Sequence, residues 1–321
     1  MASSGWSLDD VLPSEEELAW QQDMDRRLLR LRDELGPTIG SVYDRFAKRL
    51  CFGSFPGYFL HPLALPILHL PAWCARAAQR RGRTLSEQAV SDLIASCGMG
   101  YLKVRIQDDW MDERRGDPDA SMMLAEVFFA RHVHLIARYV GDHSPFWSRF
   151  DSCWFAYQEA MLHERSLHQA RSGYDRAAFD RVLLRSQPLV LPGAAVLCCA
   201  GLWDLTADLE RFVVHLARAH QLFHDLVDAE KDLQNDNYTY VLQRFSGGEG
   251  VDHLREQLFI RGGFDAIVAE VQADLQQAHR CAERIGLLEA IDYVQSRRES
   301  VSHVQQEVFR ALFMRMLGRS S

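Results

Sequence analysis

The sequence is poor in the residues that most often interrupt regular structure. Its 321 residues include only 10 prolines and 20 glycines, and the long intervals between them place apolar residues three and four positions apart. Strict alternation of apolar and polar residues, the pattern of a strand, is rare. We therefore expect an all-α protein.

An excess of positive charge is also missing. The 36 Lys and Arg residues are outnumbered by 44 Asp and Glu, for a net charge of -8. Binding to nucleic acid of any sequence, or to an anionic membrane surface, requires a cationic patch, so we expect neither partner. A composition of 47% hydrophobic and 25% charged residues is typical of a folded globular protein and excludes overall disorder.

Signals for secretion, membrane insertion and disulfide formation are lacking as well. The first twenty residues contain no basic segment followed by an apolar run, and the most apolar stretch, 59–75, is interrupted by histidines and prolines. The seven cysteines include no CxxC pair. We expect a cytoplasmic protein without stable membrane insertion. Residues 1–13 are expected to be disordered. The sequence is compatible with a monomer and with a homodimer.

What is present is helical periodicity along nearly the whole chain. Capping boxes that pair Ser14 with Glu17 and Thr84 with Glu87 predict two helix starts, and three glycines in 246–250 predict a surface turn. No repeat or linker divides the sequence, so we expect one domain over residues 1–321. The expected helices are 14–34, 38–50, 61–79, 84–112, 119–140, 144–171, 175–186, 187–200, 204–245, 263–285 and 287–317.

A first group of carboxylates ends one of these helices. At about 100° per residue, Asp108 and Asp112 lie about 40° apart and Asp109 lies about 100° from Asp108, so the three share one side of the helix. The stripe through Asp108 continues toward the N-terminus with Val104, Tyr101, Cys97 and Ile94. The acidic group thus ends an apolar or aromatic face.

A second group lies more than a hundred residues later. Asp225, Asp228 and Asp232 fall within about 60° of arc, and Gln221 continues their stripe toward the preceding turns. Crowded carboxylates are unfavourable unless they are solvated, protonated or shared with a cation. Oxygen ligands of this kind suit Mg²⁺, which commonly bridges carboxylates and a substrate phosphate; a solvated acidic face is the alternative.

These residues resemble the motifs of the class I isoprenoid synthases. Residues 108–112 match DDxxD, and residues 114–118 resemble the RRGxP that follows it in trans-prenyltransferases, with a shorter spacer. The second group resembles FQxxDDxxDxxxD with His224 replacing the first Asp, and it also resembles a degenerate NSE motif of terpene cyclases that uses His224, Asp228 and Asp232. Arg185 and Ser186 resemble the Lys-Thr pair that binds diphosphate.

The resemblance implies a helical barrel or bundle around a deep apolar cavity and a Mg²⁺-dependent enzyme acting on a prenyl diphosphate. It implies catalytic roles for Asp108, Asp109 and Asp228, and substrate binding by Arg185, Gln221 and Tyr101. The implied metal ligands are Asp108, Asp109, Asp112, His224, Asp225, Asp228 and Asp232. Two motif alignments disagree about whether His224 or Asp225 is a ligand.

The predicted reaction follows from one difference between this sequence and the motifs of the prenyltransferases. The GGKRxRP segment that binds isopentenyl diphosphate in prenyltransferases has only a poor counterpart here, in residues 80–83. That favours a class I terpene synthase, a lyase that ionises a linear prenyl diphosphate and cyclises or rearranges the cation. The alternatives are a prenyltransferase that condenses the allylic diphosphate with isopentenyl diphosphate or another acceptor, and a non-catalytic binding protein of the same fold.

Two other metal sites have weaker support in the sequence. His220 and His224, four residues apart, could bind a transition metal with Asp228, but a histidine near a helix core is more often structural. Glu159 and His163 have a spacing of four, whereas di-iron bundles use Glu-x-x-His pairs on two helices. We therefore expect Mg²⁺ rather than these metals.

Overall fold

The structure is a computed structural model that describes all residues except 1–13, 52–58, 61–64, 114–117, 249 and 319–321. Its contacts group the chain into two compact units, residues 1–149 with 189–204 and residues 150–188 with 205–321. The chain crosses between them three times, so neither unit is one continuous segment. The single-domain organisation stays a prediction.

The expected all-α fold class is confirmed, because the described residues form helices and no strand. The first unit contains α1 (Glu15–Glu34), α2 (Pro37–Cys51), α3 (His69–Arg80), α4 (Glu87–Glu113), α5 (Pro118–Ala137) and α8 (Val190–Cys199). The second contains α7 (Arg176–Val182), η2 (Leu183–Leu189, its last residue in the first unit), α9 (Thr206–Val227), α10 (Ala229–Gln234), α11 (Tyr240–Phe245), α12 (Val251–Arg255), η4 (Glu256–Ile260), α13 (Gly263–Ile285) and α14 (Leu288–Gly318). α6 (Pro145–Ala170) begins in the first unit and continues in the second.

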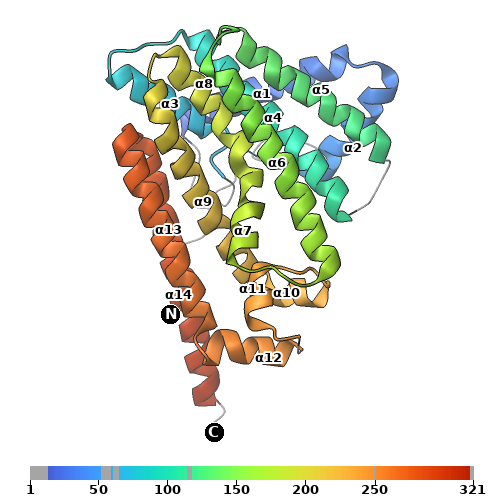
Figure 1. Cartoon of the computed structure of the whole chain (residues 1–321), viewed down its shortest axis with the longest axis vertical. Helices are drawn as coiled ribbons and strands as arrows, with labels where there is room; N and C mark the ends of the chain where they lie inside the picture. Colours follow the sequence, from blue (N-terminus) through green and yellow to red (C-terminus); the bar gives the residue numbers. More distant parts are fainter. Residues whose placement is uncertain (1–13, 52–58, 61–64, 114–117, 249, 319–321) are drawn as a thin grey trace. The chain divides into compact units, whose positions relative to one another are not determined.

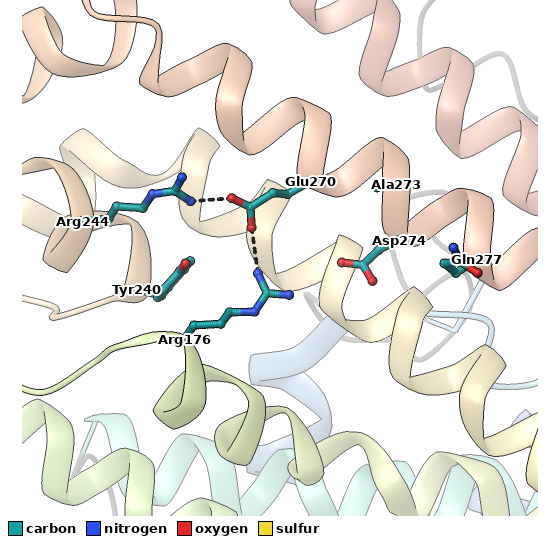
Figure 2. Close-up of a pocket in the computed structure, with 7 residues that line it drawn as sticks. All are labelled: Arg176, Tyr240, Arg244, Glu270, Ala273, Asp274 and Gln277. Carbon is teal, nitrogen blue, oxygen red and sulfur yellow. Dashed lines mark hydrogen bonds and ion pairs between the residues drawn. The ribbon is translucent and has the colours of Figure 1, made fainter.

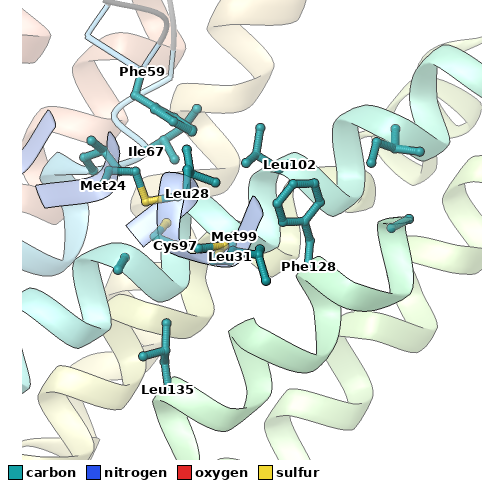
Figure 3. Close-up of a cluster of buried hydrophobic side chains, with 14 of the residues drawn as sticks. Met24, Leu28, Leu31, Phe59, Ile67, Cys97, Met99, Leu102, Phe128 and Leu135 are labelled. Atoms are coloured by element: carbon teal, nitrogen blue, oxygen red, sulfur yellow. The ribbon is translucent and has the colours of Figure 1, made fainter. Parts of the chain in front are cut away.

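The first unit is built around α4. Helix α5 packs along it, and α1, α3 and α8 contact it as well (Figure 1). Apolar residues spaced for one helical face supply the core, among them Leu28 of α1, Leu102 of α4 and Phe128 of α5, all fully buried (Figure 3). These residues belong to the apolar positions of the helical periodicity, so the same spacing that predicted the helices places them on buried faces.

A glycine allows α1 and α4 to approach closely. A Cβ at Gly98 would lie 2.8 Å from the terminal methyl carbon of Met24, which is fully buried in the core. Since Met24 lies in this core, any larger residue at position 98 must displace it. Gly98 thus leaves room for the Met24 side chain of α1 against the helix that carries the first acidic group.

The second unit is built around the pair α9 and α13. Their facing sides bury residues such as Phe212 and Val213 on α9 and Val271 on α13, and α14 packs against α13 (Figure 1). Helix α13 ends at Gly286, whose φ of 81° and backbone bond to Ala282 form the left-handed C-cap that favours glycine. This pair carries the second acidic group at the C-terminal end of α9.

Several helix boundaries differ from the predicted ones. The capping box of Ser14 and Glu17 is confirmed, but the box of Thr84 and Glu87 is wrong, because α4 begins at Glu87 and the Ser86 hydroxyl accepts the bond from the Ala89 N–H at 3.2 Å. Helix α3 begins at His69 rather than at residue 61. The predicted helix 204–245 is divided into the 3-10 segment η3 (Trp203–Leu205), α9, α10 and α11, and α12 with η4 was missed.

Two stretches of the described chain are apolar and long enough to cross a membrane by length and composition alone, residues 120–137 and 176–199. The second is not one helix: it comprises α7, the 3-10 segment η2 with Pro188, and α8. Residues Val190 to Leu197 are buried in the protein, so a buried core helix accounts for most of this apolar run.

Candidate functional site

The first acidic group lies on the last turn of α4, in the first unit. The side chain of Asp108 is partly exposed, and its nearest cation in the described residues is Arg105, at 3.7 Å. Asp109 is buried, with 8% of its side chain exposed, and each of its oxygens contacts a guanidinium: Arg49 of α2 at 2.5 Å and Arg105 at 2.8 Å. The two neighbouring carboxylates therefore have different surroundings.

The stripe leading to Asp108 is apolar, as predicted. Ile94 and Cys97 are buried in the core, and Tyr101 is partly buried with its ring 6.1 Å from that of Phe59, edge to face. Asp112 continues the helix, but its side chain lies outside the described residues, as do residues 114–117 of the RRGxP-like segment. Substrate binding by Tyr101 and metal binding by Asp112 stay predictions.

The second acidic group lies where α9 ends. We predicted one continuous helix through Asp225, Asp228 and Asp232, but α9 stops at Val227 and α10 starts at Ala229. Asp228 occupies the joint with φ of -89° and ψ of 2°, and its backbone still bonds to His224 and Asp232. The helical bonding pattern thus continues past the joint, which keeps the three carboxylates on successive turns.

Arg185 lies in the same unit, on the 3-10 segment η2. Its Nη1 contacts both oxygens of Glu164 on α6, at 2.8 and 2.6 Å, and its Nη2 donates to Gln221 Oε1 at 2.6 Å. The Gln221 amide in turn donates to Asp225 at 2.6 Å. We call this chain of Glu164, Arg185, Gln221 and Asp225 the Arg185 array.

The array was only partly foreseen. Arg185, Gln221 and Asp225 were predicted site residues and the structure brings them together, whereas Ser186, the predicted companion of Arg185, donates to the Leu183 carbonyl of its own segment. Glu164 was missed, because its partner is 21 residues away and no local spacing indicates it.

Burial dominates the electrostatics around Asp225. The side chain is 3% exposed, and desolvation raises the pKa of this carboxyl to about 7 against the lowering effects of Gln221 and Arg185. Burial likewise raises the pKa of Asp232, whose Oδ1 accepts a bond from Asn237 at 3.0 Å. These carboxylates lack a full counter-charge, and a bound cation would favour their ionised form.

Asp228 and His224 are more exposed than these two aspartates. Asp228 Oδ2 lies 3.5 Å from His224 Nε2 and 3.4 Å from Lys231 Nζ, which are loose contacts, and the His224 ring is 60% exposed. Asp228 therefore has oxygens that a cation can reach. Metal binding by His224 stays a prediction.

Two further titratable residues border the Arg185 array, Tyr174, which is buried, and His168, which is partly buried. The charges of Glu164 and Arg185 act on His168 and Tyr174, whose rings lie 6.4 Å apart. Burial lowers the pKa of His168 and raises the pKa of Tyr174. Both residues were missed, since a single His or Tyr on a helical chain gives no signal of its own.

The carboxylate oxygens of the two acidic groups fit Mg²⁺ that is bound together with water and substrate phosphate. Among the residues that the structure describes, no three His, Cys, Asp or Glu side chains converge to hold a metal ion. Mg²⁺ usually binds one or two carboxylates together with water and substrate phosphate rather than an all-protein cage. The partly exposed Asp108 and Asp228 suit that mode better than a preformed transition-metal site with His220.

A pocket of about 500 Å³ lies elsewhere in the second unit, and Figure 2 shows its charged lining. Arg176 and Arg244 reach Glu270 from two sides, at 2.7 and 2.5 Å. Of the predicted site residues that the structure describes, none lines it. It is therefore not the predicted deep apolar cavity, which stays a prediction.

Solved structures of prenyl diphosphate synthases have the same fold. A geranylgeranyl pyrophosphate synthetase from the archaeon Geoglobus acetivorans matches with a TM-score of 0.66 at 14% identity, over 86% of this chain and 98% of that one. A geranylgeranyl pyrophosphate synthase from Corynebacterium glutamicum matches with a TM-score of 0.64 at 15% identity, over 92% and 97%. The latter synthase complexed with calcium and isoprenyl diphosphate matches with a TM-score of 0.62 at 14% identity, over 90% and 98%.

By sequence, no known family profile and no curated protein matches the chain. The structural likeness nevertheless spans nearly the whole length of each neighbour. The chain has the all-α fold of the class I isoprenoid synthases, as the two acidic motifs implied.

Proposed function

We propose that this protein is a Mg²⁺-dependent enzyme that ionises a prenyl diphosphate and transfers the prenyl group to an acceptor that holds a double bond. The observation that carries the proposal is the Arg185 array, which joins a guanidinium to the acidic group at the end of α9. The structural neighbours are geranylgeranyl pyrophosphate synthases, which supports the prenyltransferase reaction over the terpene synthase that the sequence favoured.

The chain's own residues would act on the diphosphate. Arg185 would donate hydrogen bonds to its oxygens, with Glu164 and Gln221 fixing the plane of the guanidinium. Asp108 in the first unit and Asp228 in the second would each bind Mg²⁺, and bound metal would supply the charge that stabilises the departing diphosphate. The allylic C–O bond would break with its electron pair on the diphosphate, and the π electrons of the acceptor double bond would form a C–C bond to the cation. The new cation would then lose a proton to the released diphosphate or to water, which restores a double bond.

A terpene synthase is the second candidate, and one observation favours it. The poor GGKRxRP counterpart at residues 80–83 is exposed; it begins at the last residue of α3 and continues into the segment after that helix. A protein without a site for isopentenyl diphosphate would ionise one substrate and let the cation close on itself. A non-catalytic protein of the same fold would bind neither substrate productively.

One incubation series separates the three functions. The protein is mixed with Mg²⁺ and geranyl, farnesyl, geranylgeranyl or geranylfarnesyl diphosphate, each with and without isopentenyl diphosphate. Longer prenyl diphosphates formed only with isopentenyl diphosphate support transfer, whereas hydrocarbons or alcohols formed without it support a terpene synthase. No diphosphate release under any condition, together with no Mg²⁺-dependent diphosphate binding by calorimetry, contradicts both enzymes.

A further inference from the structure

The contact between Arg49 and Asp109 joins two helices of the first unit. Arg49 lies on the last turn of α2 and Asp109 on the last turn of α4, and Nη2 of Arg49 is 2.5 Å from Oδ2 of Asp109. The carboxylate is almost completely buried, whereas the Arg49 side chain is 42% exposed. A buried charge without a partner is costly, so the guanidinium stabilises Asp109 in this conformation.

Among the residues that the structure describes, two arginines contact Asp109, and they differ in origin. Arg105 lies four residues before Asp109 on the same helix, so this contact depends only on the local helix geometry. Arg49 comes from another helix, 60 residues away in the sequence. The Arg49 contact alone can therefore form or break when α2 and the end of α4 change their separation or side-chain orientation.

A cation that approaches Asp109 must compete with Arg49. The guanidinium occupies one of the two carboxylate oxygens, and its positive charge repels a second cation at the same position. Arg49 also contacts the Phe46 ring on its own helix, with its guanidinium carbon 5.7 Å from the ring centre, and this contact does not depend on Asp109. Release from Asp109 therefore leaves Arg49, which is already partly exposed, with a remaining partner in the Phe46 ring.

We propose that Arg49 is a positioning residue that occupies Asp109 in the metal-free protein and opposes Mg²⁺ binding at the acidic end of α4. The inference rests on the proposed function, because it assumes that Mg²⁺ is the cation. It adds a contribution from α2. An arginine outside both acidic motifs partly determines the Mg²⁺ concentration at which the acidic end of α4 binds the metal.

The test is titration of the metal-free protein with MgCl₂ by isothermal calorimetry, with and without inorganic pyrophosphate. Arg49→Gln should bind Mg²⁺ about three- to thirtyfold more tightly than wild type, because the competing charge is gone. Arg49→Lys, which keeps the charge, should remain near wild type. The matched control is Arg45→Gln on the same helix, where the native arginine donates to the Ser41 hydroxyl at 3.0 Å, and its Mg²⁺ affinity should not change.

Two further measurements exclude a merely structural effect. In an Asp109→Asn background, Arg49→Gln should leave Mg²⁺ affinity unchanged, because the competition needs the carboxylate. The metal-free Tm of Arg49→Gln should fall, and saturating Mg²⁺ should raise that Tm by more than it raises the wild-type Tm. If Arg49→Gln does not fold by circular dichroism, Arg49→Leu, which keeps aliphatic contact with Phe46, replaces it.

The outcomes distinguish the inference from the function on which it rests. Wild-type protein that binds Mg²⁺ while Arg49→Gln binds it equally or more weakly overturns the inference alone. Wild-type protein that binds no Mg²⁺, even with pyrophosphate, overturns the proposed function and the inference together. Tighter binding that persists in the Asp109→Asn background also overturns the inference, because the effect then does not act through Asp109.

Discussion

Arg185 and Asp225 are joined by one side-chain amide, that of Gln221, which accepts from the guanidinium and donates to the carboxylate, both at 2.6 Å. This arrangement assigns the orientation of the amide, because its oxygen must face Arg185 and its nitrogen Asp225. A residue predicted to bind diphosphate and a residue predicted to bind metal are thereby held in a fixed relation within one unit. Substitutions in this array should therefore change diphosphate binding, and substitutions of the acidic groups should change turnover.

The first prediction concerns Arg185. Arg185→Gln should raise the KM for the prenyl diphosphate about 10- to 100-fold, because hydrogen bonds from a charged group to the diphosphate are lost. Arg185→Lys should be intermediate, since it keeps the charge without the paired donors. The measurement is steady-state kinetics with each diphosphate that the wild type uses.

Arg181→Gln is the matched control for this substitution, because Arg181 is an exposed arginine four residues before Arg185. It should leave KM unchanged. A KM for Arg185→Gln equal to that of the control would show that Arg185 is a structural partner of Glu164 and does not contact substrate.

The second prediction concerns the partly exposed aspartates. Asp108→Asn and Asp228→Asn should each lower kcat at least about a hundredfold while the Tm of the metal-free protein changes by less than about 2 °C. Their contacts to cations are long, at 3.7 and 3.4 Å, so little folding energy depends on them. Turnover is measured with saturating Mg²⁺ and Tm by circular dichroism.

Asp252→Asn serves as control for both, since Asp252 is fully exposed on α12 and contacts Arg255 at 3.7 Å. Near-wild-type turnover in either test variant would contradict metal-assisted ionisation. A collapsed fold in both would instead make these aspartates structural, and the site assignment would fail.

The sequence predicted the parts of this protein that depend on local spacing. Helical periodicity predicted the all-α fold, and the stripe from Ile94 to Asp108 predicted an apolar face that ends in a carboxylate. The grouping of Gln221 with Asp225 also followed from a spacing of four residues. Such features need only the geometry of one helix.

Features that join distant segments could not be predicted in this way. The contacts from Arg49 to Asp109 and from Glu164 to Arg185 link different helices, and an arginine or glutamate on an amphipathic helix has many possible partners. The end of α9 at Val227, with Asp228 as its cap, was also missed. The end of α10 at Gln234 was missed too, although the sequence held a signal for it: the run Asn-Asp-Asn at 235–237 forms the turn, and Asp236 has φ of 63°, a conformation that Asp and Asn tolerate.

The third prediction concerns the pH dependence of stability. His132 of α5 is buried against Ser96, and burial lowers its pKa from 6.5 to about 4. The unfolded chain therefore takes up a proton between pH 6.5 and pH 4 that the folded chain does not, so this contribution to stability is complete above pH 6.5 and is lost as the pH falls toward 4. The slope approaches about 1.4 kcal/mol per pH unit.

Urea unfolding at pH 7.0 and pH 5.0 measures this effect. The free energy of unfolding of the wild type should fall by up to about 2 kcal/mol more between the two pH values than that of His132→Gln. His134→Gln, at an exposed position on the same helix, should keep the wild-type pH dependence. Equal pH dependence in wild type and His132→Gln would contradict the assignment.

The last prediction concerns a buried carboxylate that the function does not use. Asp92 is 1% exposed; its Oδ1 accepts from Arg27 at 2.7 Å, and its Oδ2 contacts Arg138 at 3.1 Å and the Tyr139 hydroxyl at 2.8 Å. Asp92→Asn should destabilise the protein by about 2 to 4 kcal/mol, because Arg27 and Arg138 lose a buried counter-charge and Arg27 keeps only the partly exposed Asp23. Asp44→Asn, which breaks the exposed pair with Arg32, should cost less than about 1 kcal/mol. Urea unfolding of both variants at pH 7 tests the contrast, and equal losses would show that burial does not strengthen the contacts of Asp92.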